Sequence, residues 1–349
     1  ISTFYILKDN VMDEYIKKLK LLLENSDYEE EYKRKCIEYA ERLLLNGLPV
    51  IYDLEHLILV LGIKKKILTK MIFAYHNFYS TVEIPKKSGG SRKLQIPSVE
   101  LKYIQRWILD NILKKIKISK HAIGFCNEKS IVDNAKIHIG NKCILNMDIK
   151  DFFPSVNFEM VFRIFIYYGY TKELSFIFTR LCTYDGFLPQ GSPASPYISN
   201  IVSLKIDKRL SRLAEKYHAN YSRYADDITF SSNSSMKKLP EIIQKILLEE
   251  GFMVNKKKTR FQYFYQRQEV TGLIVNNGRV RVKKSYKKEL YQTIYYCQKF
   301  GVNNHLEKIN CYKNFYKEYL YGKAYFINMV EPEEGKKIFK LLEEIQWDY

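Results

Sequence analysis

Two adjacent carboxylates, Asp226 and Asp227, are the residues of this 349-residue chain best suited to chemistry. They follow the β-prone residues 221–223 and precede the β-prone run 228–230, a pattern that predicts a strand, a tight turn and a second strand. Arg223 is the only obvious local partner for their charge. Adjacent anions repel each other, so such a pair usually needs a divalent cation. Asp is also common in surface turns, so the pair alone supports this only weakly.

A third acid, Asp148, occurs in a matching context upstream. It ends the apolar run 143–147, which predicts a buried strand. If the two strands are neighbours, three carboxylates form a cluster that suits two Mg²⁺ ions, with Mn²⁺ as a possible substitute. One ion would activate an attacking hydroxyl and the other would stabilise departing pyrophosphate. Asp148 alone is equally well explained as a helix N-cap or a loop acid. Together with the acid pair it favours a metal site.

Other residues are candidates for holding a nucleotide. The ring of Phe153 could press on a bound sugar and exclude a 2′-hydroxyl, although a core aromatic is the ordinary explanation. The Gly/Pro-punctuated loop 189–193 opens a helix, so Gln190 and nearby N–H groups could contact a base pair or triphosphate, or the loop could simply start the helix. Arg92 and Lys93 follow two glycines and could grip phosphates or occupy a solvated hairpin tip.

Three consecutive lysines, residues 256–258, precede Thr259. One of them could donate a proton to departing pyrophosphate, and the others are candidates for contacts with phosphate or water. We take Lys257 as the proton donor, but residue types alone leave the choice among the three open.

A strongly basic segment follows near the C-terminus, with six bases and no acid in ten residues. Tyrosines then recur at largely helical spacing, including Tyr295, Tyr312 and Tyr316. Basic charge with interleaved aromatics is typical of a groove that grips RNA phosphates and stacks on unpaired bases. The alternative is a solvated basic helix above a tyrosine-lined core. The six bases are Arg279, Arg281, Lys283, Lys284, Lys287 and Lys288.

Both helices and strands are expected to position these residues. Apolar residues recur at helical spacing in several segments, and turn residues separate the β-prone runs. Helices are expected at 11–45 with a break at 25–27, then at 52–78, 98–116, 157–168, 197–217 and 239–250, and from about residue 284 onward. Strands are expected at 83–97, as a hairpin with its turn at 86–90, and at 141–148, 222–231 and 261–275, where the last runs should close a sheet.

The overall composition indicates a nucleic-acid partner. The chain has 57 Lys and Arg against 39 Asp and Glu, a net charge of +18. Residues 1–47 hold 8 of these bases and 10 of these acids, so the remainder holds 49 bases against 29 acids, near +20. Six scattered cysteines without a C-x-x-C pair fit a reduced protein. No apolar run reaches the length of a membrane span, and no signal peptide is recognisable, so we expect a cytoplasmic protein without a membrane partner.

The order of these motifs resembles the palm motifs of reverse transcriptases over roughly residues 48–275. Asp148 with Phe152-Phe153-Pro154-Ser155 comes first, then Pro189-Gln190-Gly191, Tyr224-Ala225-Asp226-Asp227, and Gly251 with Lys257-Lys258-Thr259. The resemblance implies an α+β right-hand polymerase fold. It divides the chain into an N-terminal helical extension (1–47), fingers and palm with an antiparallel sheet (48–275) and a helical, RNA-binding thumb (276–349).

The same resemblance implies an RNA-directed DNA polymerase that consumes deoxynucleoside triphosphates, and it assigns residues to each task. The metal ligands would be Asp148, Ile149, Asp226 and Asp227. The nucleotide contacts would come from Arg92, Lys93, Asp151, Phe152, Phe153, Gln190 and Gly191.

Two short motifs resemble the retron subgroup of this family. Asn134 and His138 form an N-A-x-x-H motif, and Val270-Thr271-Gly272 forms a V-T-G motif. The resemblance implies RNA contacts by Asn134, His138, Thr271 and Gly272, although the first two equally suit a hydrogen-bonded structural pair. It also implies that the enzyme reverse-transcribes part of its cognate non-coding RNA (msr-msd) from a guanosine 2′-hydroxyl. The product would be branched RNA–DNA (msDNA), with a role in antiphage defence alongside an effector protein.

Two other functions compete with this interpretation. An intron-encoded or other bacterial reverse transcriptase is disfavoured, because no Cys/His-rich endonuclease tail follows the thumb segment. A non-catalytic RNA-binding scaffold is disfavoured as well, because all three acids, Gln190 and a candidate lysine are present.

Overall fold

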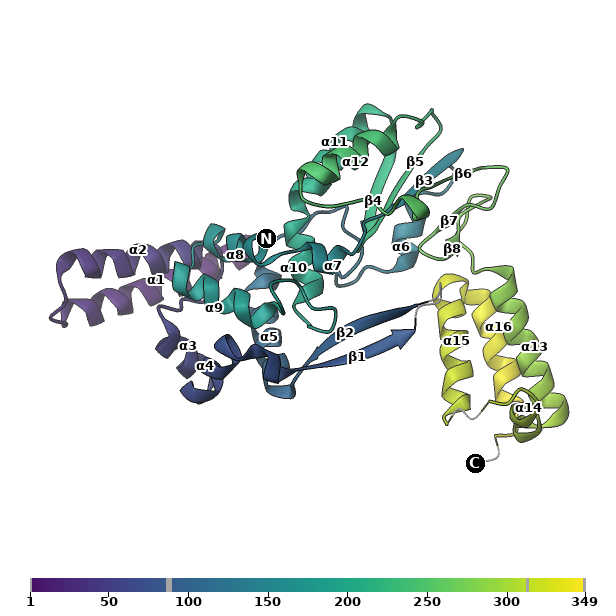
Figure 1. Ribbon diagram of the computed structural model, residues 1–349, viewed down its shortest axis with the longest axis horizontal. Coiled ribbons are helices and arrows are strands. Elements are labelled where there is room, and N and C mark those ends of the chain that lie inside the picture. The colour runs from purple at the N-terminus through teal and green to yellow at the C-terminus, as the bar shows by residue number, and fades with distance from the viewer. Residues whose placement is uncertain (1, 86–89, 312–313, 348–349) are drawn as a thin grey trace. The chain divides into compact units, whose positions relative to one another are not determined.

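The computed structural model describes residues 2–85, 90–311 and 314–347, with side chains from residue 12 onward (Figure 1). The chain forms two compact units. The first unit comprises residues 1–119 and 150–206, and the second comprises residues 120–149 and 207–349. The chain therefore enters the second unit, returns to the first and enters the second again. The division into extension, fingers with palm, and thumb stays a prediction.

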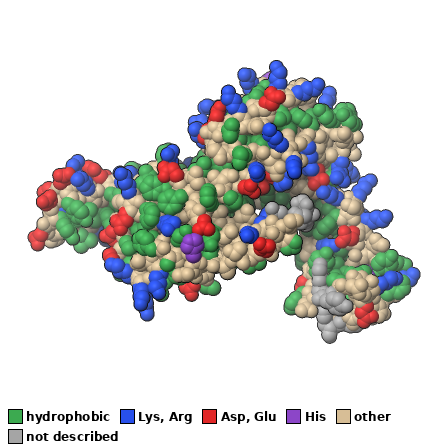
Figure 2. Space-filling view, viewed as in Figure 1, with side chains coloured by type: hydrophobic (Ala, Val, Ile, Leu, Met, Phe, Trp, Pro, Cys, Tyr) green, Lys and Arg blue, Asp and Glu red, His purple; other side chains and the backbone are tan. Residues whose placement is uncertain are grey.

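The first unit begins with two helices, α1 (Ser2–Glu24) and α2 (Glu30–Leu45), as the periodicity of residues 11–45 predicts. Tyr39, in α2, donates its hydroxyl to the carbonyl of Ile51 at 2.6 Å. Arg42 donates to the carbonyl of Gly169 at 3.1 Å. These contacts attach α2 to the rest of its unit. Figure 2 shows acidic and basic side chains intermingled where α1 and α2 are connected, as expected for a nearly neutral segment.

A β-hairpin follows a set of short helices in the first unit. Strands β1 (Tyr79–Pro85) and β2 (Ser91–Pro97) pair antiparallel, as predicted, and most of the predicted turn, residues 86–89, lies outside the described residues. Ser98 then accepts a hydrogen bond from the N–H of Leu101 at 3.3 Å and caps α5 (Val99–Asn111). The other helices of this unit are α3 (Leu54–Leu61), α4 (Lys65–Phe73), η1 (Tyr75–Phe78), η2 (Leu113–Lys115), α7 (Phe152–Ser155), α8 (Phe158–Tyr167), α9 (Lys172–Cys182) and α10 (Ser195–Val202).

The predicted helix at 197–217 is interrupted. Ser203 separates α10 from α11 (Leu204–Lys216). Its hydroxyl donates to the carbonyl of Ser199 at 2.8 Å, a local bond that competes with regular helix geometry. The single-helix prediction was therefore wrong at this residue.

The second unit contains a four-stranded antiparallel sheet in the order β4-β5-β3-β6. The strands are β3 (Cys143–Asp148), β4 (Asn220–Tyr224), β5 (Asp227–Ser232) and β6 (Arg260–Tyr263). Strand β3 is paired on both sides and almost wholly buried, which explains its unbroken apolar run. The expectation that all strands of residues 261–275 join this sheet was wrong, because β7 (Glu269–Val270) and β8 (Leu273–Ile274) form a separate hairpin.

The β7–β8 hairpin shares one hydrophobic core with the C-terminal helices. Val270 and Leu273 belong to the same buried cluster as Leu290 and Leu320. The remaining elements of this unit are α6 (Ile131–Lys136), α12 (Leu239–Glu249), η3 (Lys256–Lys258), α13 (Lys284–Phe300), α14 (Val302–Lys308), α15 (Tyr316–Val330) and α16 (Pro332–Glu343). Across the described helices of both units, none has the length and hydropathy required of a transmembrane segment.

Candidate active site

The pairing of β3 with β5 brings the predicted acids to one end of the sheet. Asp148 lies directly opposite Asp227 in the antiparallel register. The N–H of Ile149 donates to the carbonyl of Asp226 at 2.9 Å, which continues the alignment by one residue. The prediction that the strands carrying these acids are neighbours is confirmed. The described side chains do not, however, include three His, Cys, Asp or Glu residues already converged into a metal-ligand set.

A two-residue turn carries the acid pair. Tyr224 pairs with Asp227, so only Ala225 and Asp226 connect β4 to β5. Ala225 has φ = +56°, a left-handed conformation that is unusual for a residue with a side chain. Gly124 packs against this turn, since a Cβ on Gly124 would lie 2.6 Å from the nitrogen of Ala225. A side chain at residue 124 would therefore displace the turn.

The segment before Gly124 is joined to strand β4 by backbone hydrogen bonds. The N–H of Ile123 donates to the carbonyl of Arg223 at 2.8 Å, and the N–H of Arg223 donates to the carbonyl of His121 at 2.8 Å. Ala122 forms the parallel bridge to Arg223. The segment therefore acts as a short additional strand that holds Gly124 in place.

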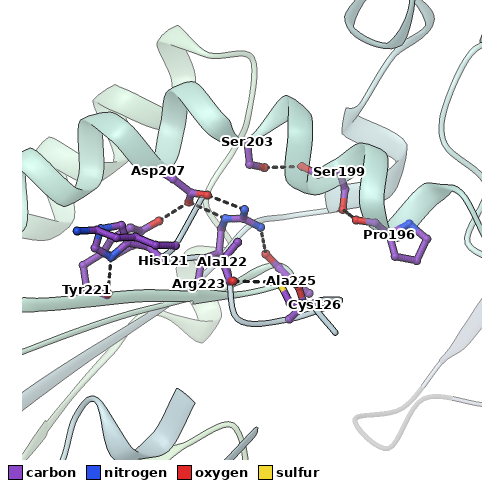
Figure 3. Close-up of polar contacts among 12 residues, drawn as sticks. His121, Ala122, Cys126, Pro196, Ser199, Ser203, Asp207, Tyr221, Arg223 and Ala225 are labelled. Atoms are coloured by element: carbon purple, nitrogen blue, oxygen red, sulfur yellow. Dashed lines mark hydrogen bonds and ion pairs between the residues drawn. The ribbon is translucent and has the colours of Figure 1, made fainter. Parts of the chain in front are cut away.

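A buried ion pair between Arg223 and Asp207 lies beside the turn (Figure 3). Arg223 donates from Nε and Nη2 to the two carboxylate oxygens of Asp207, each at 2.8 Å, and from Nη1 to the carbonyl of Ala225 at 3.0 Å. Both charged side chains have no exposed surface. Tyr221 donates its hydroxyl to Asp207 at 2.7 Å. Arg223, which the sequence suggested as a local partner of the acid pair, is a bidentate partner of Asp207 and thereby fixes the turn.

Asp148 is held by two residues from the segment around η3. Asn255 donates from Nδ2 to Asp148 Oδ1 at 3.1 Å, and Lys258 donates from Nζ to Asp148 Oδ2 at 2.7 Å. The hydrogen bond to Asp148, followed by the charges of the three acids, raises the pKa of Lys258. Of the three lysines, Lys258 is the one with a hydrogen bond to Asp148, whereas the assignment of Lys257 as proton donor stays a prediction.

Local crowding changes the ionisation of Asp227. Burial, followed by the negative charges of Asp226 and Asp148, raises the pKa of Asp227 to about 6. Asp227 nevertheless keeps exposed surface. A carboxyl group whose pKa is raised by burial and by neighbouring negative charge suits a bound divalent cation, whose charge favours ionisation. The oxygen-only donor set fits Mg²⁺ or Mn²⁺.

A pocket of about 450 Å³ joins the acids to the V-T-G motif. Thr271 and Gly272 form the turn between β7 and β8, both with positive φ. The lining residues with predicted roles are Asp148, Asp227, Lys257, Thr271 and Gly272, and Lys258 also faces this space. Residues that were predicted from separate motifs therefore line one concave surface.

Asn134 and His138 lie inside the second unit, with no exposed surface. His138 places Nδ1 2.8 Å from Ser231 Oγ and Nε2 2.7 Å from Ser222 Oγ. Ser222 donates its one hydroxyl proton to Asn134 Oδ1 at 2.6 Å, so it accepts from His138 Nε2–H, and His138 Nδ1 accepts from Ser231. Burial lowers the pKa of His138 to about 3 and keeps it neutral. This geometry supports the structural-pair alternative for both residues over direct RNA contact.

The loop predicted to contact the nucleotide packs on strand β2 within the first unit. A Cβ on Gly191 would collide with the carbonyl of Gln95. Gln190 Oε1 is buried and finds no hydrogen-bond partner among the described residues, which suits a site that receives a donor from a ligand. On the same strand, Arg92 and Lys93 are exposed, with Lys93 Nζ 3.8 Å from Glu83 Oε1.

Asp151, Phe152 and Phe153 also belong to the first unit. Asp151 is exposed, has φ = +47° and precedes α7. The Phe152 side chain is 4% exposed and its ring centroid lies 5.8 Å from that of Phe153, which is half-buried. Phe152 is therefore a core residue here, while Phe153 keeps part of its surface available.

The predicted RNA-binding bases are not equivalent. Lys283 Nζ lies 2.8 Å from Glu269, and Lys287 Nζ lies 2.9 Å from Glu331. Arg281 donates to the carbonyl of Asn276 at 3.4 Å, whereas Arg279, Lys284 and Lys288 are exposed. Among the tyrosines, Tyr316 is buried, Tyr295, Tyr319 and Tyr325 are exposed, Tyr291 is half-buried, and Tyr312 lies outside the described residues.

Three residues of this site, Gly124, Asp207 and Asn255, were not predicted from the sequence. Gly124 and Asp207 carry no local sequence signal, because their roles depend on contacts with a turn far along the chain. Asn255 directly precedes the three lysines, among which residue types left the choice open. The 3₁₀ geometry of η3 was the missing signal, since its three residues per turn point consecutive lysines in three directions.

Comparisons with known proteins agree with this geometry. A family model described as "Reverse transcriptase (RNA-dependent DNA polymerase)" matches residues 84–289. Retron Ec86 reverse transcriptase of Escherichia coli is 33% identical, with 90% of this chain and 97% of the relative covered. Retron Mx162 reverse transcriptase of Myxococcus xanthus is 32% identical, with 88% and 70% covered. A telomerase structure from Candida albicans aligns with 79% of this chain and 59% of that chain at 13% identity and a TM-score of 0.44, too distant for any further argument.

Proposed function

Because the chain belongs to the retron reverse transcriptases and is therefore an RNA-directed DNA polymerase, we propose that it copies part of a structured RNA encoded beside its own gene. The observation that carries this proposal is the register of the sheet, which sets Asp148 opposite Asp227 with Asp226 adjacent. An acid cluster of this kind suits the transfer of a nucleotidyl group to the end of a DNA strand that is paired with RNA. The basic charge of the chain suits binding of that nucleic acid.

Reverse transcriptases generally use divalent metal ions, and the carboxylates of this chain are suitable ligands for them. We propose that Asp148, Asp226, Asp227 and the main-chain carbonyl of Ile149 hold two Mg²⁺ ions, with Mn²⁺ as a substitute. When bound, the metal supplies a Lewis acid that favours the attacking alkoxide and neutralises the leaving pyrophosphate. The pKa of Asp227, raised by burial and then by the charges of Asp226 and Asp148, supports this assignment.

The remaining groups would bind substrate or move protons. We propose that Lys258, which donates a hydrogen bond to Asp148 and has a raised pKa, gives a proton to departing pyrophosphate. Gln190 and Gly191 would contact the incoming base pair, and Phe153 would exclude a 2′-hydroxyl. Arg92, Lys93 and Asp151 would contact the deoxynucleoside triphosphate.

We further propose the product that retron membership suggests. Synthesis would start from a guanosine 2′-hydroxyl of the cognate RNA and give branched RNA–DNA, with an effector protein completing a role in antiphage defence. The test is to express the gene with its native flanking DNA and to separate the extracted nucleic acid on a denaturing gel, with and without RNase. A discrete DNA whose mobility changes after RNase treatment supports an RNA-linked product. Activity only on an added primer–template would contradict self-priming.

The catalytic assignment predicts the behaviour of Asp226→Asn combined with Asp227→Asn. Loss of both charges removes the metal ligands of the turn, so DNA synthesis should fall by at least about 10³-fold. RNA binding should stay within about twofold, because neither residue would grip phosphate. Synthesis is measured by primer extension and binding by fluorescence anisotropy. DNA accumulation at the wild-type rate would show that the acids are not catalytic.

A further inference from the structure

A second concave surface lies in the same unit, away from the catalytic acids. It has a volume of about 670 Å³ and runs between the β6–β7 loop and the segment that leads into α13. We call it the basic groove. Its chemistry is set by two aromatic residues and four cations: Phe264, Tyr265, Arg267, Arg279, Arg281 and Lys284.

The two aromatic rings form an exposed shelf. Phe264 is 63% exposed and Tyr265 is 70% exposed, values that are unusual for neighbouring large rings. Their centroids lie 5.4 Å apart in an edge-on arrangement. Tyr265 also stacks on Tyr263 of β6 at 5.6 Å and 5° between planes, so its ring is anchored to the sheet. A fixed aromatic face open to solvent is suited to stacking with another planar group.

Part of the charge beside this shelf is uncompensated, although Arg267 lies 3.8 Å from Glu269. Glu331 is the one acid that lines the groove, and it is already used: it accepts from the N–H of Val282 at 2.8 Å and from Lys287 at 2.9 Å. Among the ion pairs seen within residues 2–85, 90–311 and 314–347, none involves Arg279 or Lys284. The groove therefore presents positive charge that an anion with several phosphates would neutralise.

The loop that carries the shelf is held in one conformation. Asn276 Oδ1 accepts from the N–H of Gln268 at 2.7 Å, and Asn276 Nδ2 donates to the carbonyls of Phe264 at 3.3 Å and Gln266 at 2.9 Å. Arg281 donates to the carbonyl of Asn276 at 3.4 Å. Because one asparagine fixes both sides of the loop, little conformational entropy would be lost when a ligand binds.

We propose that the basic groove binds an unpaired nucleotide of the RNA, with its base stacked on Phe264 and Tyr265 and its phosphates on Arg279 and Lys284. This assignment rests on the proposed function and names a specific recognition surface for its RNA. A duplex keeps its bases stacked internally, so an aromatic shelf selects an unpaired strand. An acidic protein would satisfy the cations but would leave the shelf without a planar partner.

The test compares nucleic-acid affinity in the full chain by fluorescence anisotropy. The probes are a short unstructured RNA, DNA of the same sequence, and a blunt-ended RNA duplex. The variant is Phe264→Ala combined with Tyr265→Ala. Its matched control is Tyr28→Ala combined with Tyr32→Ala, which removes a pair of exposed rings from the first unit at 58% and 51% exposure.

The groove variant should bind the unstructured RNA about tenfold to hundredfold more weakly, with its affinity for the RNA duplex unchanged. The control variant should bind both RNAs like the wild type. Unchanged affinity for the unstructured RNA would overturn the proposal, as would equal losses in the groove and control variants. A loss confined to DNA would overturn the assignment to RNA. Thermal unfolding midpoints within experimental error of the wild type show that the exposed substitutions leave the fold intact.

A separate measurement distinguishes this proposal from the proposed function. Extension of a DNA primer annealed to a homopolymeric RNA template should proceed at the wild-type rate in the groove variant, since its shelf lies outside the catalytic pocket. If the wild type makes no DNA in any assay while the groove variant still loses affinity for the unstructured RNA, the proposed function fails and the groove assignment stands.

Discussion

Lys258 illustrates how one side chain among three similar neighbours is selected for the site. The 3₁₀ turn of η3 directs only Lys258 to Asp148 Oδ2, at 2.7 Å. Lys257 borders the same pocket without that hydrogen bond. A proton donor must lie within hydrogen-bond reach of the group that it protonates, and we propose Lys258 for this role because it already lies at the acids.

Substitution of each lysine in turn distinguishes proton donation from a general effect of positive charge. Lys258→Gln should lower kcat for nucleotide addition by about 10² and flatten the alkaline limb of the pH–rate profile, because the proton donor is removed. Lys257→Gln, the matched control, should lower kcat by less than about threefold. Single-turnover extension measures both. Equal losses in the two variants would indicate that the lysines act only through general positive charge.

His138 makes a second prediction at the residue scale. Its pKa is 6.5 in an ordinary setting and about 3 in the folded chain, so the unfolded chain binds a proton that the folded chain does not. The stability that comes from neutral His138 is complete above pH 6.5 and is lost as pH falls toward 3. At pH 5 the loss is about 2 kcal/mol.

The measurement is the free energy of unfolding in denaturant at pH 7 and pH 5. His138→Gln should be less stable than the wild type at pH 7, because the hydrogen bonds to Ser222 and Ser231 are disturbed. Its further loss on going to pH 5 should be about 2 kcal/mol smaller than that of the wild type. Parallel pH dependence in the two proteins would mean that His138 titrates normally.

The β4–β5 turn is the element on which the site depends. Its backbone contains a left-handed Ala225, and its stability comes from outside the hairpin, through Gly124 and the Arg223–Asp207 pair. A residue with a side chain in this conformation persists only where surrounding contacts hold it. The conformation of the turn therefore depends on contacts with other parts of the second unit.

Breaking the buried ion pair should therefore affect stability and catalysis together. Asp207→Asn leaves Arg223 charged and buried, which costs about 3–5 kcal/mol in the free energy of unfolding. Under conditions where the variant is folded, kcat should also fall, since Arg223 anchors the carbonyl of Ala225. Denaturant unfolding and primer extension measure the two effects.

The exposed pair between Arg163 and Glu159 provides the control for this experiment. Both side chains are largely exposed, at 76% and 59% of their surface. Glu159→Gln should change the free energy of unfolding by less than about 0.5 kcal/mol and leave kcat unchanged. A similarly small effect of Asp207→Asn would mean that the buried pair does not support the turn.

Elements with a strong local signal could be predicted from the sequence. The apolar run that ends at Asp148 and the β-prone flanks of Asp226 and Asp227 predicted the two strands, and their pairing followed from the chemistry expected of three acids. The contribution of Gly124 could not be predicted, because it depends on the approach of a distant turn. Asp207 resembles an ordinary helix residue until its helix is placed beside β4.

At the scale of the whole molecule, charge is distributed in a way that predicts salt dependence. Residues 1–47 hold 8 bases and 10 acids, whereas the remainder holds 49 bases and 29 acids. Binding to RNA releases counterions in proportion to the phosphates that are neutralised. Bases outside the first 47 residues should therefore determine how steeply affinity falls with salt.

Two triple variants test this distribution. Arg279→Gln, Lys284→Gln and Lys288→Gln together should reduce the slope of log affinity against log salt by about 0.7 for each phosphate that the protein no longer neutralises. Lys17→Gln, Lys18→Gln and Lys20→Gln remove the same charge from the nearly neutral segment and should leave the slope unchanged. Both slopes come from anisotropy titrations at several salt concentrations. Identical slopes in the two variants would show that only net charge matters.

The pairing of β3 with β5 also determines when the active site can form while the protein is being translated. Asp148 leaves the ribosome long before Asp227, and the chain between them folds largely into the other unit. Strand β6 and Lys258, which complete the surroundings of Asp148, follow later still. The nascent chain therefore cannot bring Asp148 and Asp227 together early in translation. A chain that is active in DNA synthesis must already have formed the most non-local strand pairings of the sheet.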